Sequence, residues 1–242
     1  MGREGLIDGV PYKLFSILPL TEQISVADYL NLARAELDNL PPDTPAIFVG
    51  GTGFYINALI NGISPMPNVS PENRRRAREQ IARNPSQLCC AAVNGLDPQR
   101  AARALEVLLE TGKPIEYWQS LPRTGGLATS NQQPTAILIN PPRETINARI
   151  AARIPKMLSG GALREAENII AKELPENRAI GSAQLCKYLR GEISESDAIE
   201  NWTTKTQQYA KRQRTWFRTQ FTPDIIIDNI PTENDINKIK EV

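Results

Sequence analysis

The spacing of apolar residues along the chain predicts a mainly helical protein. Over 25–40, apolar side chains recur every three or four positions behind Ser25, and Asp28 follows three residues after that serine. This is the pattern of an amphipathic helix that begins with a capping box. Similar spacing, with caps at Ser70, Asp97 and Ser194, predicts further helices over 71–83, 98–111, 143–158, 162–172, 180–190 and 195–221.

Three short apolar runs between the helices predict buried strands over 44–51, 135–142 and 224–229. The first run ends in two glycines and leads into the helical segment 53–61, which is the strand, turn and helix order of a parallel α/β sheet. Such a turn directs backbone N–H groups at an anion above the sheet edge. A tight turn without a ligand is the alternative.

Composition excludes several kinds of active site. The 242 residues contain no histidine, so catalytic Ser-His-Asp triads, Cys-His pairs and HExxH zinc sites are excluded. The three cysteines, Cys89, Cys90 and Cys186, form no CxxC pair, which argues against a disulfide framework and favours a reducing compartment. No apolar run reaches the roughly 18 residues of a membrane helix. The segment MGREGLIDG lacks the apolar stretch that follows the basic start of a signal peptide, so we expect none. We expect a cytoplasmic monomer without a membrane partner.

Charge is unevenly distributed although the formal net charge is only +1. Residues 1–60 hold seven acidic and three basic side chains, whereas 201–222 hold five basic side chains and no acidic one. The basic end is therefore the candidate contact for a polyanion. A second group of arginines, between Arg74 and Arg83, fits either a solvated helix face or a phosphate contact.

Four blocks of sequence together resemble one family. They are IFVGGTGFYINAL at 47–59, DPQRAARALEVLLETGKPI at 97–115, RAIGSAQLCKYLRGEIS at 178–194 and QQYAKRQRTWFR at 207–218. In this order they resemble the tRNA dimethylallyltransferases, and the resemblance runs from about residue 10 to 229. It implies transfer of a dimethylallyl group from dimethylallyl diphosphate to N6 of the adenosine immediately 3′ of the anticodon, with the tRNA anticodon stem-loop as partner.

The resemblance also implies a fold class and a domain arrangement. We expect an α/β protein whose parallel-sheet core is of the P-loop-NTPase-like type, made of 1–64 and 133–242 and ending in the basic helix. A helical insert over 65–132 is expected to bind tRNA. Compared with the family, the chain resembles an N-terminally truncated member, because the first strand and the P-loop are missing.

The matching positions imply roles for individual residues. Thr52 is expected to orient the target adenine, the flanking Gly50, Gly51 and Gly53 to allow close backbone approach, and Arg178 to bind the donor diphosphate. The residues expected to contact tRNA are Arg74, Gln99, Arg100, Arg103, Lys211, Arg212, Gln213 and Arg218.

Structural alternatives remain open for several of these positions. The Thr52 hydroxyl could satisfy its own turn, and Arg178 could be a solvated surface residue. Arg103 could pair with Glu106 one turn along the helix. Trp216 fits an apolar packing anchor better than a platform for base stacking.

The family's donor-binding motif, GxxxxGK[ST], does not occur in this sequence, and neither does the following Asp-Ser pair whose aspartate is the family's general base. Mg²⁺ is the cofactor that the resemblance implies, but the chain has no residues for it. Because the phosphate clamp supplies a large part of catalysis, we expect negligible transfer by this chain alone. A noncatalytic tRNA-binding protein and an unstable truncated product are the alternative interpretations.

Overall fold

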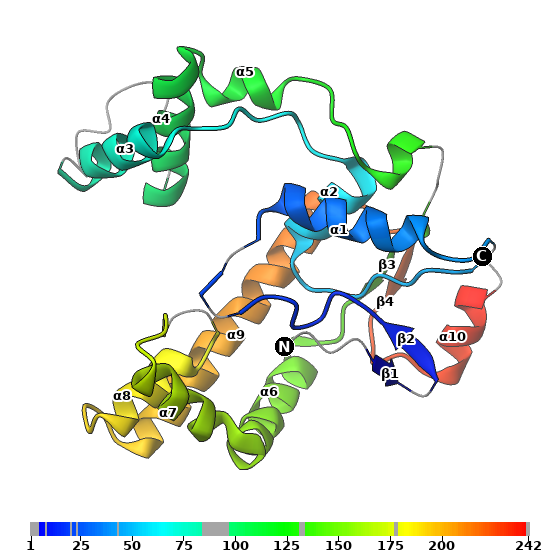
Figure 1. The fold of residues 1–242 in the computed structure, drawn as a ribbon. Helices are drawn as coiled ribbons and strands as arrows, with labels where there is room; N and C mark the ends of the chain where they lie inside the picture. Colours follow the sequence, from blue (N-terminus) through cyan, green and yellow to red (C-terminus); the bar gives the residue numbers. More distant parts are fainter. Residues whose placement is uncertain are drawn as a thin grey trace. The chain divides into compact units, whose positions relative to one another are not determined.

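The computed structural model describes residues 5–7, 9–19, 21–22, 24–42, 44–83, 97–130, 134–176 and 179–240. The chain divides into two compact units, the first made of Met1–Asn57 with Gln133–Val242 and the second of Ala58–Gln132. Helices dominate both units (Figure 1). Within the described ranges, no helix combines the length and the apolar character that crossing a membrane requires.

The main core of the first unit lies among four helices: α6 (Arg143–Met157), α7 (Leu163–Ala171), α8 (Ser182–Leu189) and α9 (Glu195–Gln220). Its buried side chains include Ile154, Leu185 and Trp202, so each helix presents one apolar face inward. A π-helical turn, η2 (Leu158–Ala162), joins α6 to α7, and Gly161 takes a φ of 109° within it. The two helices predicted there are therefore linked by a kink.

Capping boxes begin two helices of this unit, as predicted. The Ser194 Oγ accepts a hydrogen bond from the backbone N–H of Asp197 at 3.1 Å, and the Asp197 carboxylate accepts one from the Ser194 N–H at 3.3 Å. Ser25 and Asp28 make the same exchange at the start of α1 (Val26–Asp38). These local bonds satisfy backbone donors that the helix itself leaves unpaired.

Two small two-stranded sheets complete the first unit. β3 (Ile137–Ile139) pairs in parallel with β4 (Ile225–Ile227), which confirms two of the predicted strands in shorter form. β1 (Gly5–Ile7) and β2 (Val10–Tyr12) form an antiparallel hairpin that was not predicted, because three residues are too few to show an alternating pattern. A short helix, α10 (Glu233–Lys240), follows β4.

The strand predicted over 44–51 is wrong. Residues 44–50 form no ladder with any described strand, and the side chains of Ile47 and Val49 are 86% and 82% exposed. A strand is defined by hydrogen bonds to a neighbouring strand, so an apolar run alone does not create one. The only parallel pairing among the described residues is between β3 and β4.

The second unit contains α3 (Pro71–Arg83), α4 (Pro98–Thr111), α5 (Ile115–Gln119) and the 3₁₀ turn η1 (Leu127–Ser130). Asp97 caps α4, as predicted, and Gly112 ends it with a φ of 68°. Ile81, Ala101 and Ala104 form the buried contact between α3 and α4. Because alanine side chains are small, the two helices approach closely. Polar side chains at the border of this contact can therefore reach from one helix to the other.

Candidate functional site

The turn at 50–53, here called the Thr52 turn, leads into α2 (Gly53–Asn61). The Thr52 carbonyl accepts hydrogen bonds from the N–H groups of Tyr55 and Ile56, at 3.0 and 3.3 Å, so the helix begins at this residue. Its side chain is exposed, and its hydroxyl makes no hydrogen bond with any described residue. The hydroxyl therefore does not satisfy its own turn, and it can donate to and accept from a ligand.

Helix α9 holds the Thr52 turn through two side chains one helical turn apart. The amide Nε2 of Gln213 donates to the Gly51 carbonyl at 2.9 Å. A Cβ added to Gly51 would overlap that amide, and one added to Gly53 would overlap the six-membered ring of Trp216. At Gly50 a Cβ would instead lie 3.7 Å from Ile56 Cδ1, an ordinary contact. Glycine is therefore needed for close approach at Gly53, where the indole ring is rigid, whereas at Gly51 the flexible Gln213 side chain could shift away and lose its bond to the carbonyl.

Tyr55 connects the Thr52 turn to α1. Its hydroxyl donates to the Ile24 carbonyl at 3.1 Å, and its ring meets the ring of Tyr29 edge to face, with centroids 5.2 Å apart. Burial raises the pKa of Tyr29, so that phenol stays neutral. The start of α2 is thus supported from α1 as well as from α9, whose C-terminal end lies beside it (Figure 1).

Five basic side chains of α9, here called the α9 cations, lie without a carboxylate partner: Lys205, Lys211, Arg212, Arg214 and Arg218. No ion pair joins them to any acidic group within the described ranges. The guanidinium of Arg212 lies 5.8 Å from the ring centroid of Tyr209, which leaves its N–H donors available. Unpaired cations on one helix are suited to the phosphates of a nucleic acid backbone.

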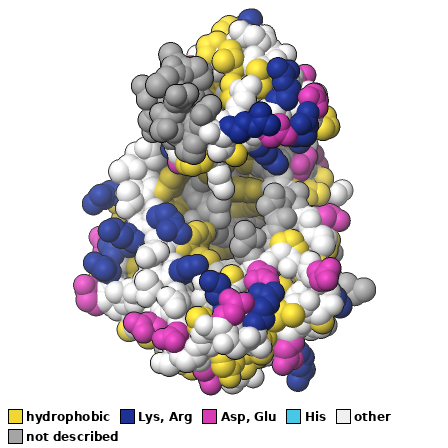
Figure 2. Space-filling view, turned by 90° about the vertical axis from the view of Figure 1, so that its left-hand side faces the viewer, with side chains coloured by type: hydrophobic (Ala, Val, Ile, Leu, Met, Phe, Trp, Pro, Cys, Tyr) yellow, Lys and Arg dark blue, Asp and Glu magenta, His cyan; other side chains and the backbone are white. Residues whose placement is uncertain are grey.

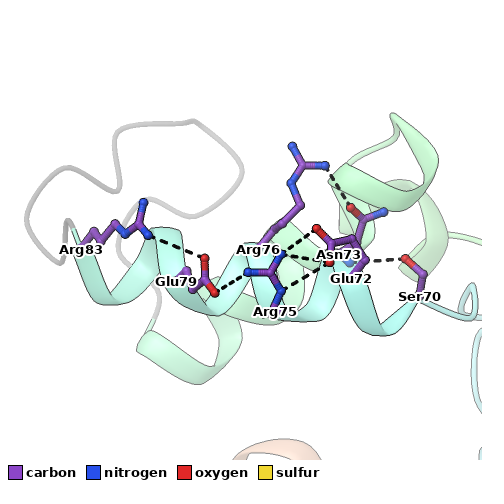
Figure 3. Close-up of polar contacts among 7 residues, drawn as sticks. All are labelled: Ser70, Glu72, Asn73, Arg75, Arg76, Glu79 and Arg83. Atoms are coloured by element: carbon purple, nitrogen blue, oxygen red, sulfur yellow. Dashed lines mark hydrogen bonds and ion pairs between the residues drawn. The ribbon is translucent and has the colours of Figure 1, made fainter.

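The arginines of α3 differ, because carboxylates of the same helix bind two of them, Arg75 and Arg83 (Figure 3). Arg75 donates to Glu72 at 2.9 Å and to Glu79 at 2.7 Å, and these hydrogen bonds raise the pKa of its guanidinium. Arg83 lies 3.8 Å from Glu79. Figure 2 shows the same mixing of basic and acidic side chains on the second unit, at the top of the view. Arg74 is exposed and has no ion pair with a described residue.

Two arginines of α4 that are predicted to contact tRNA already form ion pairs. Arg100 lies 3.2 Å from Asp97, and Arg103 lies 3.2 Å from Glu106, whose side chain is 8% exposed. Arg78 of α3 approaches the same carboxylate at 3.8 Å. The structure therefore shows the intrahelical ion pair that was the alternative interpretation of Arg103. Gln99 is exposed and makes no side-chain hydrogen bond within the described part of the chain.

A family model described as IPP transferase matches residues 4–220. The chain belongs to this family. A tRNA dimethylallyltransferase of Zymomonas mobilis is 36% identical over 223 residues, which are 87% of this chain and 71% of that protein. One from Novosphingobium aromaticivorans is 36% identical over 233 residues, 88% of this chain and 79% of that protein.

Solved structures support the same fold. The crystal structure of a tRNA delta(2)-isopentenylpyrophosphate transferase from Staphylococcus epidermidis superposes with a TM-score of 0.64 and 22% identity. The match covers 97% of this chain and 80% of that one. At this level of identity, the comparison shows a shared architecture of the IPP transferases.

The predicted site residues of this IPP transferase are divided between the two compact units. The Thr52 turn and the α9 cations are joined within the first unit, whereas Arg74, Gln99, Arg100 and Arg103 belong to the second. Arg178 lies outside the described residues. Sequence reasoning placed Gln213 on tRNA and missed its bond to Gly51, because no local pattern signals a contact between residues 162 positions apart.

The described residues do not form a site for the Mg²⁺ that the family resemblance implies. Among the described residues, no group of three or more Asp, Glu or Cys side chains could hold a metal ion. No described ligand set can therefore be assigned to Mg²⁺, and the function proposed below includes no step through it.

Proposed function

We propose that this chain acts in tRNA dimethylallylation by binding tRNA along α9 and by orienting the target adenine at Thr52. The observation that carries the proposal is the bond from Gln213 to Gly51, which joins the Thr52 turn to the helix that bears the unpaired cations. Both parts lie in one compact unit. The names of the relatives, tRNA dimethylallyltransferases, agree with this chemistry.

The reaction explains why a hydroxyl is useful at this position. The exocyclic N6 of adenine is a weak nucleophile, so an enzyme must hold it in line with the allylic carbon of the donor and remove a proton. An adenine taken out of the anticodon loop presents its hydrogen-bonding edge to protein groups. The exposed Thr52 hydroxyl can bond to that edge and fix its orientation. We assign Arg178 to the donor diphosphate, which a permanently charged guanidinium suits.

The phosphate contacts are proposed to centre on the α9 cations. A cation that already bonds to a carboxylate has part of its charge neutralised and fewer free N–H donors for phosphate, whereas an unpaired one needs only to lose water. Lys211, Arg212 and Arg218 are exposed and unpaired within the described residues. In the second unit, Arg74 and Gln99 are also exposed and make no such bond with a described residue. Arg100 and Arg103 already form ion pairs.

A titration with unmodified tRNA over a series of salt concentrations tests this function. We expect affinity to fall steeply with salt, with a slope set by the number of phosphate contacts. A second tRNA with uridine in place of the target adenosine should bind more weakly. Thr52→Val removes the hydroxyl and keeps the shape, so it is expected to abolish that preference and leave the salt slope unchanged. Failure to bind at low salt would overturn the proposal.

Transfer itself is tested separately, with labelled dimethylallyl diphosphate and unmodified tRNA. Because the sequence lacks GxxxxGK[ST], we expect negligible transfer by the chain alone. The second candidate function, tRNA binding without catalysis, shares this expectation. Label on N6 of the target adenosine would contradict both the expectation and the second candidate.

A further inference from the structure

The Thr52 turn and the α9 cations are connected by a side chain that bears no charge. Gln213 is half-buried and lies between Arg212 and Arg214 in the sequence, but its amide is directed at the Gly51 carbonyl. One turn later, Trp216 packs on Gly53. The two glycines flank Thr52, so the two α9 side chains hold the turn on both sides of the exposed hydroxyl.

We propose that Gln213 and Trp216 are positioning residues that fix the Thr52 hydroxyl relative to the RNA backbone bound along α9. This inference rests on the proposed function for the roles of Thr52 and the α9 cations. It reassigns Gln213 from a direct tRNA contact to a contact within the protein. Arg212 and Gln213 are neighbours on one helix. A phosphate bound by Arg212 and a base bound by Thr52 are then held at a fixed distance and orientation to each other.

The contacts are specific enough to act in this way. The hydrogen bond is 2.9 Å long and ends on a backbone carbonyl, so it orients the peptide plane that precedes Thr52. The Trp216 ring leaves no room for a side chain on Gly53, which restrains the peptide that follows. Misplacing a positioning group by about 1 Å costs an enzyme on the order of a hundredfold in rate. The hydrogen bond from Gln213 and the packing of Trp216 together limit how far the Thr52 hydroxyl can move from its position.

The experiment compares Gln213→Ala with Gln208→Ala in the full chain. Gln208 lies on the same helix, is exposed and forms no side-chain hydrogen bond with a described residue, so it is a matched control. The first measurement is amide hydrogen exchange at Tyr55 and Ile56, whose N–H groups bond to the Thr52 carbonyl. Loss of one neutral hydrogen bond predicts exchange about fivefold faster in Gln213→Ala and unchanged in Gln208→Ala.

The second measurement is the preference for tRNA with adenosine over uridine at the target position. We expect Gln213→Ala to lose this preference while the salt slope of binding stays unchanged, because a neutral residue releases no counterion. A side chain that only supports the fold would not change base preference selectively. Trp216→Phe keeps an aromatic ring near Gly53 and should retain more of the preference than Trp216→Ala.

The outcomes separate this inference from the proposed function. Unchanged exchange at Tyr55 and Ile56 in Gln213→Ala would overturn the positioning role, as would equally faster exchange throughout α6–α8. If the unsubstituted chain binds tRNA without base preference, the role of Thr52 fails, and the exchange rates still decide whether Gln213 restrains the turn. Absence of tRNA binding would overturn the proposed function alone.

Discussion

Arg103 donates from Nη1 to Oε2 of Glu106 across 3.2 Å, and this carboxylate is almost fully buried between α3 and α4. A buried polar group that loses its hydrogen-bond partner costs about 1–3 kcal/mol, and more when the group is charged. We expect Arg103→Ala to lower the free energy of unfolding by about this amount, with Arg78 providing only partial compensation at 3.8 Å. Urea denaturation measures the change.

Arg100→Ala is the control for that substitution, because the Arg100 pair with Asp97 is exposed on the same helix. Exposed pairs contribute about 0–1 kcal/mol, so this variant should unfold close to the unsubstituted chain. Equal losses in the two variants would show that burial of Glu106 does not determine the effect.

Substitution of single cations should separate phosphate contacts from paired arginines. Arg212→Ala is expected to weaken tRNA binding and to reduce the salt slope by about 0.9, the value for one phosphate contact on duplex nucleic acid. Arg75→Ala should leave the slope unchanged, because Glu72 and Glu79 already bind that guanidinium. Filter binding at several salt concentrations measures both. A larger change for Arg75→Ala would contradict the assignment.

Adding a methyl group to the Thr52 turn should have position-dependent effects. Gly53→Ala places a Cβ in the ring of Trp216, and overpacking of this kind costs about 1–3 kcal/mol. Gly50→Ala meets only Ile56, at 3.7 Å, and should be tolerated. Thermal unfolding and the exchange rate of the Tyr55 amide provide the comparison. Equal tolerance at both positions would exclude the close packing described for Trp216.

Acid should weaken the contact between the ends of α3 and α4. The Asn73 amide and the Ser70 N–H and hydroxyl donate to Oε2 of Glu110 at 2.8–2.9 Å, and these bonds lower the pKa of Glu110 below its ordinary value of 4.5. A carboxyl with a lowered pKa contributes stability above its unfolded-state pKa and loses it as the pH falls through the folded-state value.

Glu110→Gln is therefore expected to reduce stability at neutral pH and to flatten its decline between about pH 5 and pH 3. Glu167→Gln is a matched control on an exposed carboxyl that makes no hydrogen bond with a described residue. Circular dichroism melting over this pH range measures both. An unchanged decline in Glu110→Gln would show that Glu110 is not the titrating group.

Helix ends were largely predictable from the sequence. Ser25 with Asp28, Ser194 with Asp197, and Asp97 begin helices where their patterns place them, because a capping bond joins residues only two or three positions apart. The strand predicted over 44–51 failed for the opposite reason. Its apolar side chains meet the local criterion, but a strand also needs a partner that local sequence does not specify.

The sequence by itself determined the family, the helical segments and the candidate hydroxyl of Thr52, since each rests on motifs that are legible within short stretches of the chain, and for the family on the order of four such stretches. Only the tertiary structure decided which groups are available for binding. It placed Gln213 on a carbonyl 162 residues away, required glycine at position 53 through Trp216, and brought Arg78 to the carboxylate of Glu106. Such contacts depend on how distant segments pack, and packing is a property of the whole fold rather than of any one segment.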